Sequence, residues 1–259
     1  MQDIQNIVIL TGAGISAESG LATFRGPDGL WEGHRVEDVC TPEALARDPL
    51  TVHRFYDARR AALAGVAPNE AHLALARLDA AWPGDLLIVT QNVDDLHERA
   101  GATRVLHMHG ELLAALCAGC GRAMRWEGPM VSPGAQAEPV EADSRHPFDG
   151  LRGSASFAPP ECPGCGAYAL RPDIVFFGEM PYQMERIERA IARADLFVSI
   201  GTAGAVYPAA GFVRTAAYHG AQTLELNLDP SAGSVYFGAT RQGPASVLVP
   251  AWVDEVLGA

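Results

Sequence analysis

The stretch NIVILTGAGIS (6–16) decides the fold of this chain. Its apolar run is typical of a strand that is buried on both faces, and it leads directly into a turn of small residues. GAGISA (12–17) fits the pattern G-x-G-x-x-G/A, in which small residues let a backbone approach a pyrophosphate at a helix N-terminus. A tight turn without a ligand is the alternative, but the preceding buried strand favours a dinucleotide site.

The same alternation of strand and helix continues along the chain. It predicts a Rossmann-like α/β fold, in which a mostly parallel sheet is covered by helices on both faces. The stretch 117–165 interrupts this alternation of strands and helices, because it is rich in Gly, Pro and Ser. We therefore expect a small inserted module there, with a mobile loop at 132–147. A strand that runs into a turn is expected within 6–16 and again within 195–208, and further strands within 104–112 and 222–230. We expect a strand, a polar loop and a short helix within 85–101, helices within 41–49, 53–63 and 68–81, and a short strand followed by a helix within 246–257.

A dehydrogenase is the obvious rival for a glycine turn of this kind. It would carry an acidic residue at the end of a second strand, roughly 20 positions after the turn. Glu37 and Asp38 lie at about that distance, but HRVEDVCTP (34–42) is too short and polar for a core strand. Hydride transfer is therefore disfavoured, and Glu225 or Asn227 is a better candidate for holding a ribose.

Four of the five cysteines form two C-x-x-C pairs. The start of the chain has no basic segment before its apolar run, so we expect no secretory signal and a cytoplasmic location. In that compartment such pairs are metal ligands more often than disulfides. Four thiolates close a tetrahedral site, which predicts one structural zinc; a redox dithiol is the disfavoured alternative. The ligands would be Cys117, Cys120, Cys162 and Cys165, while Cys40 is expected to be a small buried residue.

Composition narrows the possible partners of the chain. The formal charge of −12 over 259 residues argues against binding to a nucleic-acid backbone, although it allows a lysine-rich peptide as partner. No apolar run is long enough for a membrane span, so we expect no membrane partner. We also expect a monomer.

Polar side chains follow two of the predicted strands. Gln91, Asn92 and Asp94 offer amide and carboxylate groups suited to hydroxyls and a carboxamide. His109 precedes a glycine at a strand end, where side chains meet ligands in open α/β sheets, whereas His107 is expected to pack. A dinucleotide, a histidine base and this loop together suggest chemistry on NAD itself.

These motifs occur in the order found in the sirtuin family, and the chain resembles a compact bacterial-type sirtuin over essentially its whole length. The resemblance implies NAD-dependent removal of acyl groups from lysine side chains of proteins or peptides, with nicotinamide and O-acyl-ADP-ribose as products. The motifs that carry it are GAGIS (12–16), TFRGPDGLW (23–31), TQNVD (90–94), HG (109–110), the two C-x-x-C pairs, FGE (177–179), GTAGAVYP (201–208) and ELN (225–227).

The resemblance also implies roles for individual residues. His109 would be the general base on a ribose hydroxyl, with Asn92 as the second catalytic residue. Ala203 stands where the family usually has Ser, so we expect weaker NAD binding without loss of activity. Residues implied to bind NAD are Gly12, Ala13, Gly14, Ser16, Phe24, Arg25, Gln91, Asn92, Asp94, Gly201, Thr202, Asn227 and Leu228. Residues implied to accept the substrate backbone as an added strand are Val175, Phe176, Phe177, Gly178 and Glu179.

Tyr56 and Arg59 lie three residues apart in HRFYDARRAAL (53–63), so they share one helix face. They match the Tyr-x-x-Arg pair of the sirtuin branch that prefers malonyl- and succinyl-lysine. Arg can hold a carboxylate in a fork and Tyr can add a donor, which predicts a desuccinylase and demalonylase that retains deacetylase activity. Arg54 and Arg60 are expected on a solvated face.

Two other functions use the same motifs. The first is mono-ADP-ribosyl transfer to a protein, and the second is a non-catalytic NAD-binding module, which His109 and Asn92 disfavour. The expected domains are a NAD-binding domain over 1–30, 65–113 and 172–259, and a small domain that combines a helical insertion at 31–64 with a zinc module at 114–171.

Overall fold

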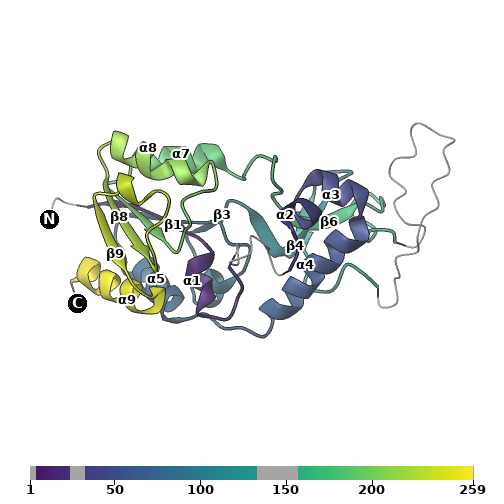
Figure 1. Ribbon diagram of the computed structural model, residues 1–259, viewed down its shortest axis with the longest axis horizontal. Helices are drawn as coiled ribbons and strands as arrows, with labels where there is room; N and C mark the ends of the chain where they lie inside the picture. The colour runs from purple at the N-terminus through teal and green to yellow at the C-terminus, as the bar shows by residue number, and fades with distance from the viewer. Residues whose placement is uncertain (1–3, 24–32, 133–156, 259) are drawn as a thin grey trace. The chain divides into compact units, whose positions relative to one another are not determined.

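The computed structural model describes residues 4–23, 33–132 and 157–258 (Figure 1). The chain forms two compact units. The larger unit comprises Met1–Phe24, Val66–His109 and Pro181–Ala259, and the smaller unit comprises Arg25–Gly65 and Gly110–Met180. The domain bounds expected from the sequence, which assign 110–113 and 172–180 to the larger domain, stay a prediction. Most of the loop expected at 132–147 lies outside the described residues.

The larger unit is built on a six-stranded parallel sheet, which confirms the Rossmann-like fold. Counted within this sheet alone, the strand order is 3-2-1-4-5-6, and the order reverses between the strands β1 and β7. In open α/β sheets, ligands bind outside the carboxyl ends of the strands at this reversal. The strands in spatial order are β3 (Val105–His107), β2 (Asp85–Thr90), β1 (Asn6–Thr11), β7 (Leu196–Ile200), β8 (Gln222–Asn227) and β9 (Ala239–Gln242).

Helices cover both faces of this sheet (Figure 1). Ile7 and Ile9 of β1 point to the face covered by α5 (Glu70–Ala81) and α9 (Ala245–Leu257). Val8 and Leu10 point to the face covered by α7 (Met184–Ile191) and α8 (Phe212–Tyr218). Because successive side chains of a strand alternate between faces, burial on both sides requires the continuous apolar run seen in the sequence.

The C-terminal segment differs from the prediction. We expected a short strand before the last helix, but α9 is one helix from Ala245 to Leu257 with Pro250 inside it. The run of valines favours a strand locally, yet Val249, Trp252 and Val253 are spaced to bury one helix face in the core shared with α5. Neither α9 nor any other helix of the described ranges is long and apolar enough to cross a membrane.

The smaller unit contains an antiparallel sheet in the order β5-β4-β6, formed by Ala123–Arg125, Gly110–Cys117 and Leu170–Ile174. The strand predicted at 104–112 is therefore divided between the two units. Gly110 has a positive φ of 85°, and a Cβ there would lie 2.0 Å from the carbonyl oxygen of Asp173. The helices of this unit are α2 (Val36–Val39), α3 (Pro42–Arg47) and α4 (Pro49–Leu63).

Two expectations for this unit are confirmed, and the first is the helix within 41–49, which forms as α3. The hydroxyl of Thr41 accepts a hydrogen bond from the backbone N–H of Ala44 at 3.0 Å and so caps α3. The segment that carries Glu37 and Asp38 forms the short helix α2 and no core strand, which removes the acidic residue that a dehydrogenase would need there.

Candidate functional site

Two glycine turns meet at the point where the strand order reverses. The backbone N–H of Gly12 donates to Ile200, and that of Gly14 donates to Gly201 at 2.8 Å. A Cβ on Gly14 would lie 2.7 Å from the Cα of Gly201, so a larger residue would force the turns apart. These glycines are thus required by contact between two protein backbones, a reason that the sequence pattern does not reveal.

Asn92, Ser16 and Asp94 are brought together beside these turns. The side-chain N–H group of Asn92 donates to the carbonyl of Gly12 at 3.2 Å and to Ser16 Oγ at 3.1 Å. Ser16 in turn donates to Asp94 at 3.0 Å. Burial raises the pKa of Asp94, while hydrogen bonds from the Leu96 N–H and from Ser16 oppose the shift. With its N–H group used in this way, the Asn92 amide offers Oδ1 to a ligand.

His109 has the arrangement of a neutral base. Its Nδ1 lies 3.1 Å from the carbonyl oxygen of Gln91. Because a carbonyl can only accept, Nδ1 carries the proton and Nε2 keeps its lone pair. Burial lowers the pKa of His109, so the imidazole is uncharged and able to take a proton at neutral pH.

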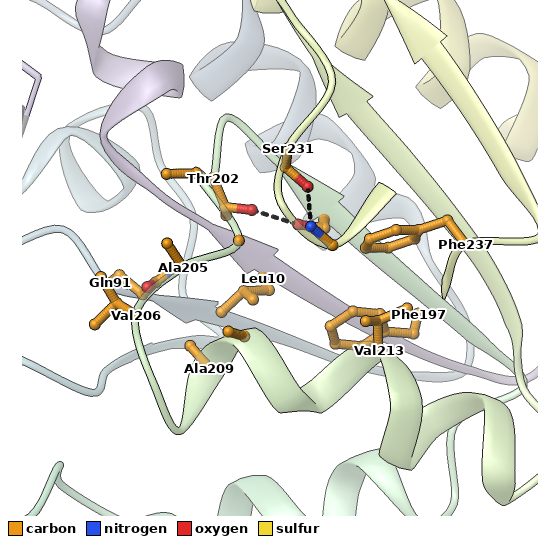
Figure 2. A pocket seen from close by; sticks show the side chains of 15 residues that line it. Leu10, Gln91, Phe197, Thr202, Ala205, Val206, Ala209, Val213, Ser231 and Phe237 are labelled. Carbon is orange, nitrogen blue, oxygen red and sulfur yellow. Dashed lines mark hydrogen bonds between the residues drawn. The ribbon is translucent and has the colours of Figure 1, made fainter. Parts of the chain in front are cut away.

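A pocket lies beside the carboxyl ends of β7 and β8 (Figure 2). It encloses about 400 Å³, including space open to solvent, with Thr202 and Ser231 on one side and the rings of Phe197 and Phe237 at its apolar end. Thr202 shares a hydrogen bond of 2.9 Å with Ser199, and its carbonyl accepts from the side chain of Asn227 at 2.8 Å. The exposed Ala203 also lines this pocket, whereas Leu228 projects outward with 64% of its surface exposed.

Glu225, one of the two residues considered for holding a ribose, forms hydrogen bonds within the chain instead. Its carboxylate is only 2% exposed, and its two oxygens accept hydrogen bonds from the hydroxyls of Ser231 and Ser234. It therefore fixes the loop that follows β8. Asn227 is left as the ribose candidate at this strand end.

Two buried histidines that the sequence did not point to lie next to Thr11 and Ser16, near the glycine turn. His97 is hydrogen-bonded to Thr11 at 3.0 Å, and His72 lies 3.4 Å from Ser16 Oγ. Burial lowers the pKa of His72 to about 4 and that of His97 well below its ordinary value, so both are neutral. Of the two, the sequence could have indicated only His72, because it lies three residues before Leu75 and therefore on the same buried face of α5.

The four cysteines of the two C-x-x-C pairs converge in the smaller unit. Their sulfur atoms all lie within 4.8 Å of one another, with 3.7 Å between Cys117 and Cys165 and 3.9 Å between Cys120 and Cys162. A tetrahedral site with Zn–S bonds of about 2.3 Å requires sulfur atoms about 3.8 Å apart. The four thiolates therefore fit one structural zinc, as predicted, and leave no coordination position for a substrate.

The predicted acyl-binding pair lies on α4. Tyr56 is fully buried with its phenol beside the thiol of Cys40, and burial raises the pKa of Tyr56 well above its ordinary value. Arg59 is close enough for its charge to act on both groups. The ring of Tyr56 stacks on that of Phe176 with centroids 6.0 Å apart. Cys40 is buried as expected, but it also contacts the predicted site.

The segment Val175–Glu179 follows β6, which ends at Ile174. The N–H of Phe176 donates to the Glu179 carboxylate at 2.8 Å, and the N–H of Phe177 donates to the Cys40 carbonyl at 3.0 Å. A substrate strand paired here would have to use other backbone groups of the segment. Phe24 and Arg25, the remaining predicted residues, lie outside the described part of the chain.

One expectation on α4 is wrong. Arg60 was expected on a solvated face, but it is 3% exposed, pairs with Asp57 at 2.5 Å and donates to the carbonyl of Leu112 at 3.0 Å. The helix face that carries Arg60 packs toward β4, and burial lowers the pKa of this guanidinium. Arg54 is exposed, as predicted.

A Rossmann-like sheet with its polar residues gathered at the strand reversal defines a nucleotide-binding α/β enzyme. The model of the Sir2 family matches residues 12–208. The NAD-dependent protein deacylase SIR2rp3 of Trypanosoma brucei brucei is 51% identical and aligns over 97% of this chain and 94% of its own length. The NAD-dependent protein deacylase of Yersinia pseudotuberculosis is 50% identical over 97% of this chain and 82% of its own length.

Solved structures agree with these relatives. A Sir2 homologue in complex with NAD has a TM-score of 0.81 and 35% identity, and the match covers 98% of this chain and 90% of that one. The chain belongs to the Sir2 family. The predicted class of enzyme, an NAD-dependent protein deacylase, is thereby confirmed, as is NAD as its co-substrate.

Proposed function

We propose that this enzyme removes succinyl and malonyl groups from lysine side chains and retains activity on acetyl-lysine. The placement of Tyr56 and Arg59 on one face of α4 carries the proposal. A guanidinium binds a carboxylate through two parallel hydrogen bonds, and acetyl-lysine has no distal carboxylate to use them. Because the pKa of Tyr56 is raised, its phenol stays protonated and can act as a donor at neutral pH.

The guanidinium of Arg59 is oriented by a ring of the same helix, which supports Arg59 as the acyl anchor. It lies 5.7 Å from the centre of the Phe55 ring, a cation–π contact. A guanidinium held in this way can present its N–H groups to an acyl carboxylate.

The larger unit would perform the reaction on NAD. When bound, NAD supplies the ribose carbon from which nicotinamide leaves. We assign Asn92 Oδ1 and His109 Nε2 to the ribose hydroxyls, with His109 taking the proton. Gln91 and Asp94 would hold the nicotinamide carboxamide, the turns of Gly12–Ser16 and Gly201 the pyrophosphate, and Thr202, Asn227 and Leu228 the adenosine half.

The partner would be an acyl-lysine in an extended peptide. A solved Sir2 protein with a p53 peptide and NAD⁺ supports this choice; it has a TM-score of 0.76 and 26% identity over 99% of this chain and 95% of that one. All the residues we assign come from one chain, so a monomer would suffice. We propose neither a nucleic acid nor a membrane as a partner.

The test is turnover of matched acetyl-, malonyl-, succinyl- and glutaryl-lysine peptides by Arg59→Met and by the exposed control Arg54→Met. Loss of a charge-assisted fork worth about 3 kcal/mol should lower kcat/KM for the succinyl peptide roughly 100-fold. Deacetylation should change less than about threefold, and Arg54→Met should change neither. Equal losses on both peptides would exclude the clamp, and labelled ADP-ribose on protein would indicate transferase activity instead.

A further inference from the structure

His107, at the end of β3, lies between two groups that can only accept hydrogen bonds. Its Nδ1 is 3.1 Å from the backbone carbonyl oxygen of Asn92, and its Nε2 is 2.9 Å from the Glu98 carboxylate. A neutral imidazole carries one N–H and would turn a lone pair toward one of these oxygens. Only a ring that is protonated on both nitrogens satisfies both contacts.

The surroundings of the ring favour this charged form. Glu98 and His97 approach it from α6 (Leu96–Arg99), and Asp94 approaches from the preceding loop. Within the part of the chain that the structure describes, these neighbours bring two carboxylates toward the ring, while His97 is neutral. The neighbouring strand β2 places Thr90, which does not titrate, in register with His107. The other charged residue of α6, Arg99, is directed to Asp95 and to the carbonyl of Val66.

His107 therefore differs from His109, two residues later. Among the described residues, His109 hydrogen-bonds with one carbonyl, whereas His107 hydrogen-bonds with a carbonyl and a carboxylate. We propose that His107 is a doubly protonated positioning residue, held by Glu98, which fixes the backbone of Asn92 and thereby aims its side chain at the NAD ribose. The inference rests on the proposed role of Asn92 and is independent of the acyl preference.

A pH dependence follows from this arrangement. When the ring loses one proton, the remaining N–H can serve only one acceptor. The carboxylate is the stronger acceptor, so the contact with Asn92 is lost. kcat/KM for NAD should therefore fall as the pH rises, in addition to the loss at low pH that protonation of His109 would cause.

Glu98→Gln tests the inference, because an amide can donate to the bare Nε2 as well as accept from it. In this variant a neutral ring can accept from the introduced amide through Nε2 and still donate Nδ1–H to the Asn92 carbonyl, so the contact with Asn92 does not depend on pH. His107→Phe removes the contact at all pH values. Glu188→Gln, an exposed change on α7 that removes a carboxylate with no ion pair in the described ranges, controls for the loss of one negative charge.

Two measurements use these variants, both with the full chain and an acetyl-lysine peptide. Long-range ¹H–¹⁵N spectra of the imidazoles should show both nitrogens of His107 protonated at pH 7 in the wild type, and loss of the second proton at lower pH in Glu98→Gln. The signals are assigned by their absence in His107→Phe. kcat/KM for NAD should decline at high pH in the wild type and in Glu188→Gln, but not in Glu98→Gln.

His107→Phe should lower kcat/KM for NAD about tenfold at neutral pH, which corresponds to the loss of one charge-assisted hydrogen bond. At high pH, kcat/KM of the wild type should fall toward the value of His107→Phe. A singly protonated His107 at pH 7 would overturn the assigned charge. Superimposable pH profiles of the wild type and Glu98→Gln would overturn the positioning role. Because the peptide is acetylated, either failure is distinguishable from a failure of the succinyl preference.

Discussion

The two units hold their functional side chains by different means. In the larger unit, Asn92, His109 and Asn227 lie at or after strand ends, and their side chains are oriented by hydrogen bonds to neighbouring backbone. In the smaller unit, Tyr56 and Arg59 lie on a helix and are oriented by burial and ring contacts. The proposed chemistry on NAD is thus tied to the sheet itself, whereas the proposed acyl preference would depend on one helix face that can vary without altering the sheet.

Removal of zinc should have the largest effect on stability. It should also distinguish the two units, because the four cysteines lie in the smaller one. Metal binding to four thiolates contributes on the order of 10 kcal/mol to the folding of small zinc modules. Chelation or Cys117→Ser should therefore abolish hydrogen-exchange protection in β4, β5 and β6 while the parallel sheet stays protected. Cys40→Ser, which leaves the four ligands intact, should retain one zinc per chain. A Cys117→Ser protein with full zinc content and normal protection would contradict the assignment.

His109→Ala should give the next largest effect, confined to the larger unit. Loss of a general base lowers kcat by about 10² to 10⁴-fold. The melting temperature and zinc content should stay close to wild type, because the one side-chain hydrogen bond of His109 to the described residues is with the carbonyl oxygen of Gln91. In the wild type, burial lowers the pKa of His109, so the base is present at neutral pH and is lost only on acidification. Full turnover by His109→Ala would rule out this base.

Ala203→Ser should give the smallest effect. Its Cβ is exposed beside the pocket at the end of β7, so a hydroxyl there can reach a bound nucleotide. One added hydrogen bond is worth about 0.5–1.5 kcal/mol, which should lower KM for NAD roughly two- to tenfold with kcat unchanged. Ala205→Ser, in the same turn, is the control; an equal change in both variants would show that the effect is not specific to this position.

The sequence predicts those features that depend on local pattern. Burial on both faces requires the apolar run of β1, and the C-x-x-C spacing by itself indicates a four-thiolate site. Features that depend on distant contacts are not predictable in this way. The division of the strand at Gly110 is set by the carbonyl of Asp173, and the burial of Arg60 by Asp57 and Leu112.

The contact between Gly14 and Gly201 has a consequence for the order in which the protein becomes functional. The first glycine turn is synthesised long before its backbone partners, Ile200 and Gly201. A ribosome must therefore add nearly two hundred residues before the turn can adopt its final form. A nascent chain of this enzyme that ends before β7 would lack a completed nucleotide-binding turn, however well its first strands had already paired.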